Sequence, residues 1–129
     1  MDKHRSLRGT LTSRIKESIF TIFGENILPP INLNASSTEI SRWKSTQNVR
    51  WCYTNLFEPM NENTTISYMA RILEKVWPDS RTPSQTQIAY AISVCQVVLD
   101  PNNKHIRITK KTIKKRFRRN LVSFAAFCK

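Results

Sequence analysis

The stretch that decides both the fold and the charge of this chain is KKTIKKRFRRNLVSF, residues 110–124. Its apolar side chains recur at intervals of three and four residues, the spacing that places them along one side of an α-helix. They are Ile113, Phe117, Leu121 and Phe124. Thr109 precedes the stretch as a candidate N-cap. We therefore predict a helix from Lys110 to Phe124 whose narrow apolar seam docks on the two helices before it.

The remaining circumference of this helix is basic. Cations recur at i, i+4 and i+8 in two neighbouring rows, formed by Lys110, Lys114 and Arg118 and by Lys111, Lys115 and Arg119. Like charges at this spacing repel each other by roughly a few tenths of a kcal/mol per pair. A polyanion lying alongside would relieve that repulsion, and the DNA major groove is wide enough to admit a helix. The pattern therefore favours a helix that binds nucleic acid.

The charge excess of the whole chain is concentrated around this segment. The 129 residues include 21 Lys+Arg and 9 Asp+Glu, a formal charge of +12. Residues 101–129 hold ten of the cations and no carboxylate, whereas residues 1–100 hold 11 cations and all 9 carboxylates. A basic helix of this kind can also be a nuclear localisation signal or simply a solvated face. It can equally be an amphipathic helix that binds a membrane surface or calmodulin.

Apolar periodicity predicts four more helices ahead of the basic one. They are Leu11–Phe23, Glu39–Phe57, Ile66–Trp77 and Gln85–Val98. Gly24 and Pro78 stand where the first and third of these should end, and Pro83 or Ser84 is positioned to start the fourth. The turn-rich segment Glu58–Asn63 divides the chain. We expect an all-α protein with a helical N-terminal region, residues 1–62, and a three-helix unit, residues 63–129. The first helix can pack on its own chain or on a partner, and the residues do not decide between the two, although packing on the same chain is the commoner outcome.

Three helices of which the last is basic resemble a homeodomain. More specifically, the chain resembles the short a-type mating-type homeodomain proteins of budding yeasts. IFTIFGENI at residues 19–27 with INLN at 31–34 carries the resemblance, as does Ile108-Thr109 leading to Ile113 and Phe117. ARILEKVW at residues 70–77 is similar to the family's first homeodomain helix. The resemblance implies a divergent three-helix homeodomain-like bundle over residues 63–129.

The resemblance also implies which residues would bind DNA. Lys115, Arg118, Arg119 and Val122 would face base edges, and Arg107, Lys111 and Lys114 would lie near phosphates. The family's recognition helix has an Asn that contacts adenine at the position that Arg119 occupies here, and Arg favours guanine or phosphate. Asn120 follows one residue later, about 100° further round the helix. We include Asn120 among the DNA-binding candidates.

The function that the resemblance implies is a nuclear transcription regulator. Such a protein binds double-stranded DNA as a heterodimer with an alpha-type homeodomain protein and represses genes specific to one cell type. The main alternative is a small basic protein, such as a viral one, that binds RNA or single strands by stacking bases on Trp43, Trp51, Tyr53 and Trp77. A third hypothesis is an interaction protein whose basic helix serves only as an import signal or a partner ligand.

Nothing in the sequence favours an enzyme, and we expect no catalytic residue, cofactor or small-molecule substrate. Only two glycines are present, too few for a glycine-rich phosphate loop, and the carboxylates form no paired motif. His4 and His105 lack neighbouring ligands, so we expect no metal. The three cysteines, Cys52, Cys95 and Cys128, are odd in number and widely spaced, which predicts reduced thiols. No run approaches the roughly 18 apolar residues that cross a bilayer, so we expect a protein that stays inside the cell and has no membrane partner. The nuclear location is what the resemblance implies.

Overall fold

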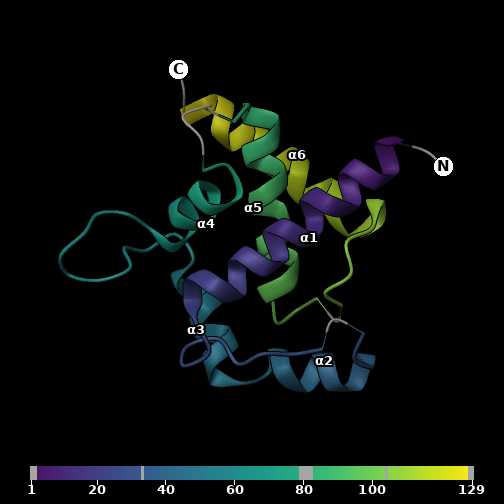
Figure 1. The fold of residues 1–129 in the computed structure, drawn as a ribbon, viewed down its shortest axis with the longest axis vertical. Helices are drawn as coiled ribbons and strands as arrows, with labels where there is room; N and C mark the ends of the chain where they lie inside the picture. The colour runs from purple at the N-terminus through teal and green to yellow at the C-terminus, as the bar shows by residue number, and fades with distance from the viewer. Residues whose placement is uncertain (1–2, 33, 79–82, 104, 128–129) are drawn as a thin grey trace.

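The computed structural model contains six α-helices over the residues that it describes, which are 3–32, 34–78, 83–103 and 105–127. They are α1 (Lys3–Phe23), α2 (Ser37–Lys44), α3 (Gln47–Asn55), α4 (Tyr68–Val76), α5 (Gln85–Leu99) and α6 (Lys110–Phe127), shown in Figure 1. Within those ranges the β-type pairing is limited to one isolated bridge between Pro59 and Ser67. The predicted all-α class is confirmed.

Hydroxyl side chains fix where the helices begin. The caps of α2 to α5 each accept a hydrogen bond from the backbone N–H three residues further on, and they are Ser36, Thr46, Ser67 and Ser84. At Ser84 the Gln87 side chain also accepts from the cap's own N–H, which completes a capping box. At the start of α6 the hydroxyl of Thr109 accepts a hydrogen bond from the N–H of Thr112 at 3.2 Å. The hydroxyl of Thr112 in turn accepts one from the N–H of Thr109 at 2.9 Å. The predicted start at Thr109 is confirmed, and of the two alternatives for α5, Pro83 and Ser84, the structure has Ser84 as the cap.

The predicted single helix from Glu39 to Phe57 is wrong, because Thr46 breaks it in two. Thr46 has an extended backbone, and its hydroxyl accepts from the N–H of Val49 and donates to the carbonyl of Trp43 at 2.6 Å. A threonine hydroxyl that binds nearby backbone groups competes with helix continuation in this way. The break leaves Trp43 buried, with its indole N–H donating to the carbonyl of Pro29 at 2.7 Å.

The first helix ends where the sequence predicts but begins earlier. Gly24 has φ +81°, the left-handed conformation that glycine adopts without steric cost, and its N–H donates to the carbonyl of Phe20 at 2.9 Å. α1 starts at Lys3, well ahead of the predicted Leu11.

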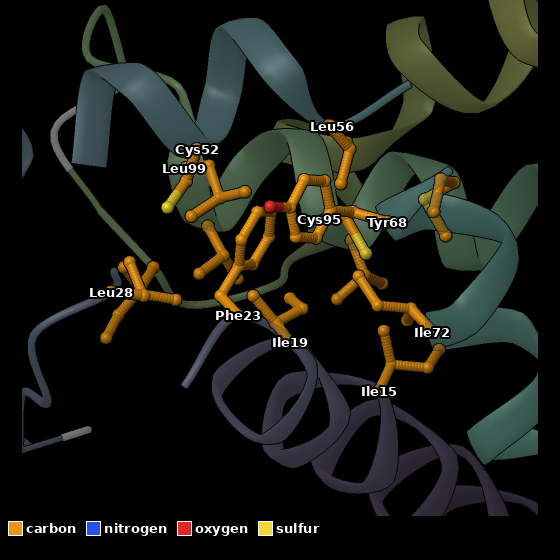
Figure 2. Close-up of a cluster of buried hydrophobic side chains, with 14 of the residues drawn as sticks. Ile15, Ile19, Phe23, Leu28, Cys52, Leu56, Tyr68, Ile72, Cys95 and Leu99 are labelled. Atoms are coloured by element: carbon orange, nitrogen blue, oxygen red, sulfur yellow. The ribbon is translucent and has the colours of Figure 1, made fainter. Parts of the chain in front are cut away.

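One hydrophobic core joins the two predicted regions. α1 packs against α4 and α5, so of the two alternatives that the sequence leaves open the first helix packs on its own chain. In Figure 2, Ile15 and Ile19 of α1 point toward side chains of α4 and α5. Phe23 stacks on Tyr68 of α4 with the ring centroids 4.5 Å apart. Residues from both sides of Glu62 therefore share a single cluster of buried side chains.

The basic helix α6 lies along α5, its main neighbour in the fold. Ile113, Phe117 and Leu121 are half-buried along its seam. Phe117 meets Tyr90 of α5 edge to face with the ring centroids 6.5 Å apart. The side chain of Phe124 lies outside the described residues. The seam is confirmed for Ile113, Phe117 and Leu121, but the predicted docking on both preceding helices is corrected, because α6 packs mainly on α5 and α4 packs mainly against α1.

Candidate nucleic-acid interface

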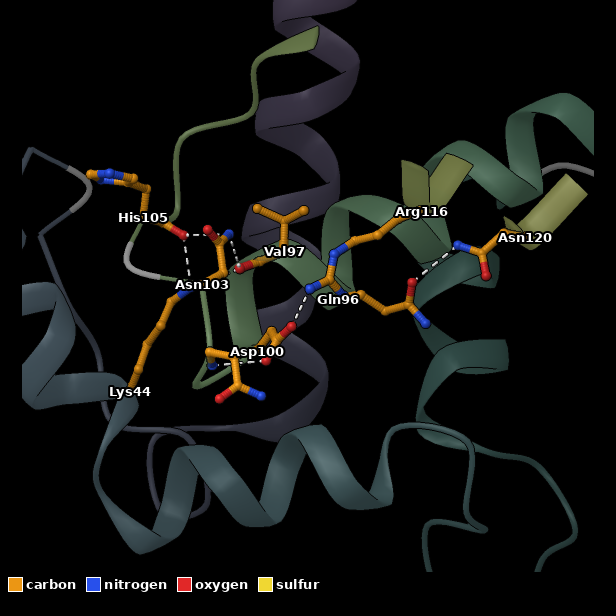
Figure 3. A network of polar contacts seen from close by, with 9 residues as sticks. Lys44, Gln96, Val97, Asp100, Asn103, His105, Arg116 and Asn120 are labelled. Atoms are coloured by element: carbon orange, nitrogen blue, oxygen red, sulfur yellow. Dashed lines mark hydrogen bonds and ion pairs between the residues drawn. The ribbon is translucent and has the colours of Figure 1, made fainter. Parts of the chain in front are cut away.

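An ion pair between the buried Asp100 and the partly buried Arg116 fixes α6 against the end of α5. Asp100 follows α5 and is 5% exposed. Its carboxylate accepts a hydrogen bond from the guanidinium of Arg116, as Figure 3 shows. It accepts another from the N–H of Asn102 at 2.9 Å. Burial alone would lower the pKa of Arg116, but the side chains of Asp100 and Tyr53 hold it above its ordinary value. Arg116 is therefore a structural cation that faces inward.

A fully buried cation, Lys44 of α2, lies close to the same junction. Only 1% of it is exposed, and its ammonium donates to the carbonyls of Val97 and His105, both at 2.7 Å. The side-chain amide of Asn103 donates to the same two carbonyls at 3.2 and 3.0 Å (Figure 3). Lys44 thus ties α2 to the loop between α5 and α6. Nothing in the local pattern around Lys44 predicts this role.

Replacing Lys44 by Met should remove a pH dependence from the stability. Burial lowers the pKa of Lys44 to about 8, with Asp100 opposing the shift and Arg116 adding to it. Above pH 8 the unfolded chain keeps a proton that the folded chain has released, so this lysine adds stability as the pH rises. Chemical unfolding at several pH values should show the wild type gaining about 2 kcal/mol over Lys44→Met between about pH 7 and about pH 9.5. Parallel curves for the two proteins would contradict this assignment.

The outward side of α6 carries the cations that the sequence predicts. The exposed ones are Lys110, Lys111, Lys114, Lys115, Arg118 and Arg119. Val122 is 69% exposed on the same helix, and Arg107 is exposed just ahead of it. In the described part of the chain the ion pairs are Arg71 with Glu74 and Arg116 with Asp100, so none of the six outward cations is paired. The result is a row of uncompensated positive charge along one helix.

Asn120 does not belong to this surface, and its inclusion among the DNA-binding candidates is corrected. Its side-chain amide donates to the hydroxyl of Ser93 at 2.8 Å and to the side-chain oxygen of Gln96 at 3.0 Å. Both amide hydrogens are therefore used within the fold, and Figure 3 shows Asn120 facing α5. Asn120 follows Phe117 by three residues, so its place beside the apolar seam was visible in the sequence.

One cation that the sequence pattern did not indicate lies close to this surface. Lys16 of α1 is half-buried, and its pKa is lowered by burial and by the nearby charge of Arg107. Lys16 and Arg107 are far apart in the sequence, and only the packing of α1 brings them together. The positive surface of α6 therefore continues onto α1.

The aromatic side chains considered for base stacking are dispersed. Trp43 is buried, Tyr53 and Trp77 are half-buried, and Trp51 is 43% exposed on α3 with its edge against Tyr68. Among them only Trp51 is an exposed ring in the part of the chain described, and it lies on a helix that packs on α5 rather than on α6.

Two cysteines lie in the described part of the chain, and both are buried free thiols. Burial raises the pKa of Cys52 to about 12 and that of Cys95 further still, so both are protonated at neutral pH. Cys128 lies outside the described residues.

Over the ranges that the structure covers, no cluster of three or more His, Cys, Asp or Glu side chains is placed to hold a metal ion. No helix there is both long enough and apolar enough to cross a bilayer.

The fold and this surface define a small all-α protein with an outward-facing cationic helix. No family model, curated protein or solved structure matches the chain.

Proposed function

We propose that the protein binds double-stranded DNA through α6 and regulates transcription. The observation that carries the proposal is the set of six outward cations on α6, none of which has an ion-pair partner in the described residues. Neutralising phosphates with such a row releases condensed counterions and gives affinity that falls steeply with salt. The protein would be a non-enzymatic regulator.

The side chains of α6 form two sets, an inward set that packs within the fold and an outward set that is exposed. The inward side chains, Arg116 and Asn120, hold the helix to α5 and leave the outward ones free for a ligand. In a homeodomain-like complex, Lys115, Arg118, Arg119 and Val122 read base edges in the major groove, while Arg107, Lys111 and Lys114 contact phosphates. Arg119 then replaces the amide that the family uses and reads guanine or phosphate.

The resemblance to a-type mating-type homeodomain proteins extends the proposal. The protein would act in the nucleus as a repressor, in a heterodimer with an alpha-type homeodomain protein that sharpens its choice of DNA site. Its three-helix homeodomain-like bundle would consist of α4, α5 and α6. α1, whose buried side chains complete the core, would support that bundle from within the same chain.

Binding to RNA or single strands is the alternative that the exposed ring of Trp51 favours. Titration of a labelled duplex and of each of its separated strands distinguishes the two. We expect tighter binding to the duplex, a preference for a defined half-site over scrambled duplex, and a greater preference when the alpha-type partner is added. Equal binding to duplex and single strands would favour the alternative.

Replacing Lys111 by Ala should weaken binding to all duplexes alike. Lys111 is exposed near the start of α6, where a phosphate contact positions the protein without reading sequence. The slope of log K against log salt should become shallower by about one unit, while the ratio of half-site to scrambled affinity stays unchanged. Anisotropy titrations over a salt series measure both quantities. A change in that ratio with an unchanged slope would mean that Lys111 contacts a base.

A further inference from the structure

A groove of about 1110 Å³ lies between α1 and the first turns of α5 and α6. Figure 1 shows the N-terminal half of α1 beside the start of α6. The apolar part of its lining consists of Leu11, Tyr90, Ile108, Ile113 and Phe117. The hydroxyls of Tyr90 and Thr12 are hydrogen-bonded to each other at 2.6 Å. That bond leaves mainly apolar surface for a ligand to contact.

The charged residues at the rim of the groove are all cations. The cations that line the groove are Lys16, Arg107, Lys110, Lys111 and Lys114, and no carboxylate of the described residues lines it. Lys16 is half-buried, so part of this charge is held away from water, where it interacts more strongly with an anion. The groove thus combines an apolar floor with an uncompensated positive rim.

We propose that this groove binds an acidic amphipathic peptide segment of a partner protein. Apolar side chains of the peptide would lie on the floor, and its carboxylates would meet the lysines and Arg107 on the rim. A second copy of this chain is disfavoured as the occupant because each copy carries a net charge of +12. A strand of phosphates would match the rim but would leave the apolar floor uncovered. The inference goes beyond the proposed DNA binding and does not depend on it.

The variant Thr86→Glu/Gln87→Glu tests the groove without removing any cation. Both residues line the groove in the first turn of α5, where carboxylates are favourable, and a glutamate at position 87 preserves the capping box. A matched control, Gln47→Glu/Ala70→Glu, adds the same charge at exposed first-turn positions of α3 and α4, neither of which lines the groove. Thermal melting followed by circular dichroism checks that both variants fold.

The probe is a fluorescent synthetic peptide of about 15 residues, long enough for about four helical turns. It carries Leu and Phe at i, i+3, i+4 and i+7 and Glu or Asp elsewhere. One control peptide has the carboxylates replaced by amides, and another has the apolar residues replaced by serine. We expect the full peptide to bind, each control peptide to bind at least about tenfold more weakly, and Thr86→Glu/Gln87→Glu to weaken binding about tenfold through like-charge repulsion. The Gln47→Glu/Ala70→Glu control should bind within about twofold of wild type, because its added charges lie outside the groove.

Three results would overturn the proposal. They are the absence of peptide binding, equal binding of the serine peptide, and an equal loss of affinity in the Gln47→Glu/Ala70→Glu control. The same variants are titrated with duplex DNA. If Thr86→Glu/Gln87→Glu weakens duplex binding and leaves peptide binding unchanged, the groove belongs to the nucleic-acid surface and the peptide proposal is wrong. If the protein binds no duplex while the peptide titrations give the expected results, the proposed DNA binding is wrong and the peptide proposal stands.

Discussion

Replacing Asp100 by Asn should lower the free energy of unfolding by about 3 kcal/mol. The carboxylate of Asp100 is almost fully buried, and it is the anion that faces both Arg116 and Lys44. Without it the buried Lys44 and the partly buried Arg116 have no countercharge, and loss of one partner of such a pair is costly. A domain of this size has a total stability of about 5–15 kcal/mol, so the loss should be plain in urea unfolding curves.

The exposed pair of Arg71 and Glu74 provides the matched control for this experiment. Its two charged atoms are 3.3 Å apart, and the side chains are 46% and 60% exposed. Solvent screens such a pair, so Glu74→Gln should cost no more than about 0.5 kcal/mol. If Asp100→Asn proves as mild as Glu74→Gln, the Asp100–Arg116 pair does not hold α6 in place.

Replacing Arg118 and Arg119 together by Ala should remove the preference for one duplex sequence over another. Both side chains are exposed on the outward face of α6, and an Arg that pairs with guanine discriminates by about 1–3 kcal/mol. The ratio of half-site to scrambled affinity should therefore fall by about 100-fold, which competition titrations measure directly. Because neither side chain is buried, the melting temperature should change little.

The double variant Arg42→Ala/Arg50→Ala removes the same charge from exposed positions on α2 and α3. It should leave the ratio of half-site to scrambled affinity intact, since its arginines lie outside α6. An equal drop in that ratio for this control, or a ratio that survives Arg118→Ala/Arg119→Ala, would contradict the assigned role of α6.

Much of the fold was predictable from local signals in the sequence. Ser84 and Thr109 mark the helix starts because a hydroxyl oxygen can satisfy a free N–H, and Gly24 marks the end of α1 because it tolerates a positive φ. The break at Thr46 was missed because the loose apolar spacing around it fits one long helix as well as two short ones. The Thr46 hydroxyl decides between them through its hydrogen bonds to the backbone of Trp43 and Val49. The spacing of apolar residues gives no information about such bonds.

On the candidate surface, the exposure of a side chain could be predicted where it depends only on which side of the helix the residue lies. Arg118 and Arg119 are exposed because they lie opposite the seam. Arg116 and Lys44 differ, because their environments are set by Asp100 and by the loop around Asn103, which lie far from Lys44 in the sequence. Spacing predicts which side of a helix faces inward. It does not predict which charged partner lies there.

Selection of binding sites from a pool of random duplexes tests the central claim most directly. The purified 129-residue protein is used alone, with an alpha-type homeodomain protein, and as the Arg118→Ala/Arg119→Ala variant. We expect that the wild-type protein enriches a defined short motif, that the partner strengthens the enrichment, and that the double variant enriches none. A wild-type pool that stays as random as the starting pool, with and without the partner, would contradict the claim that α6 reads DNA sequence.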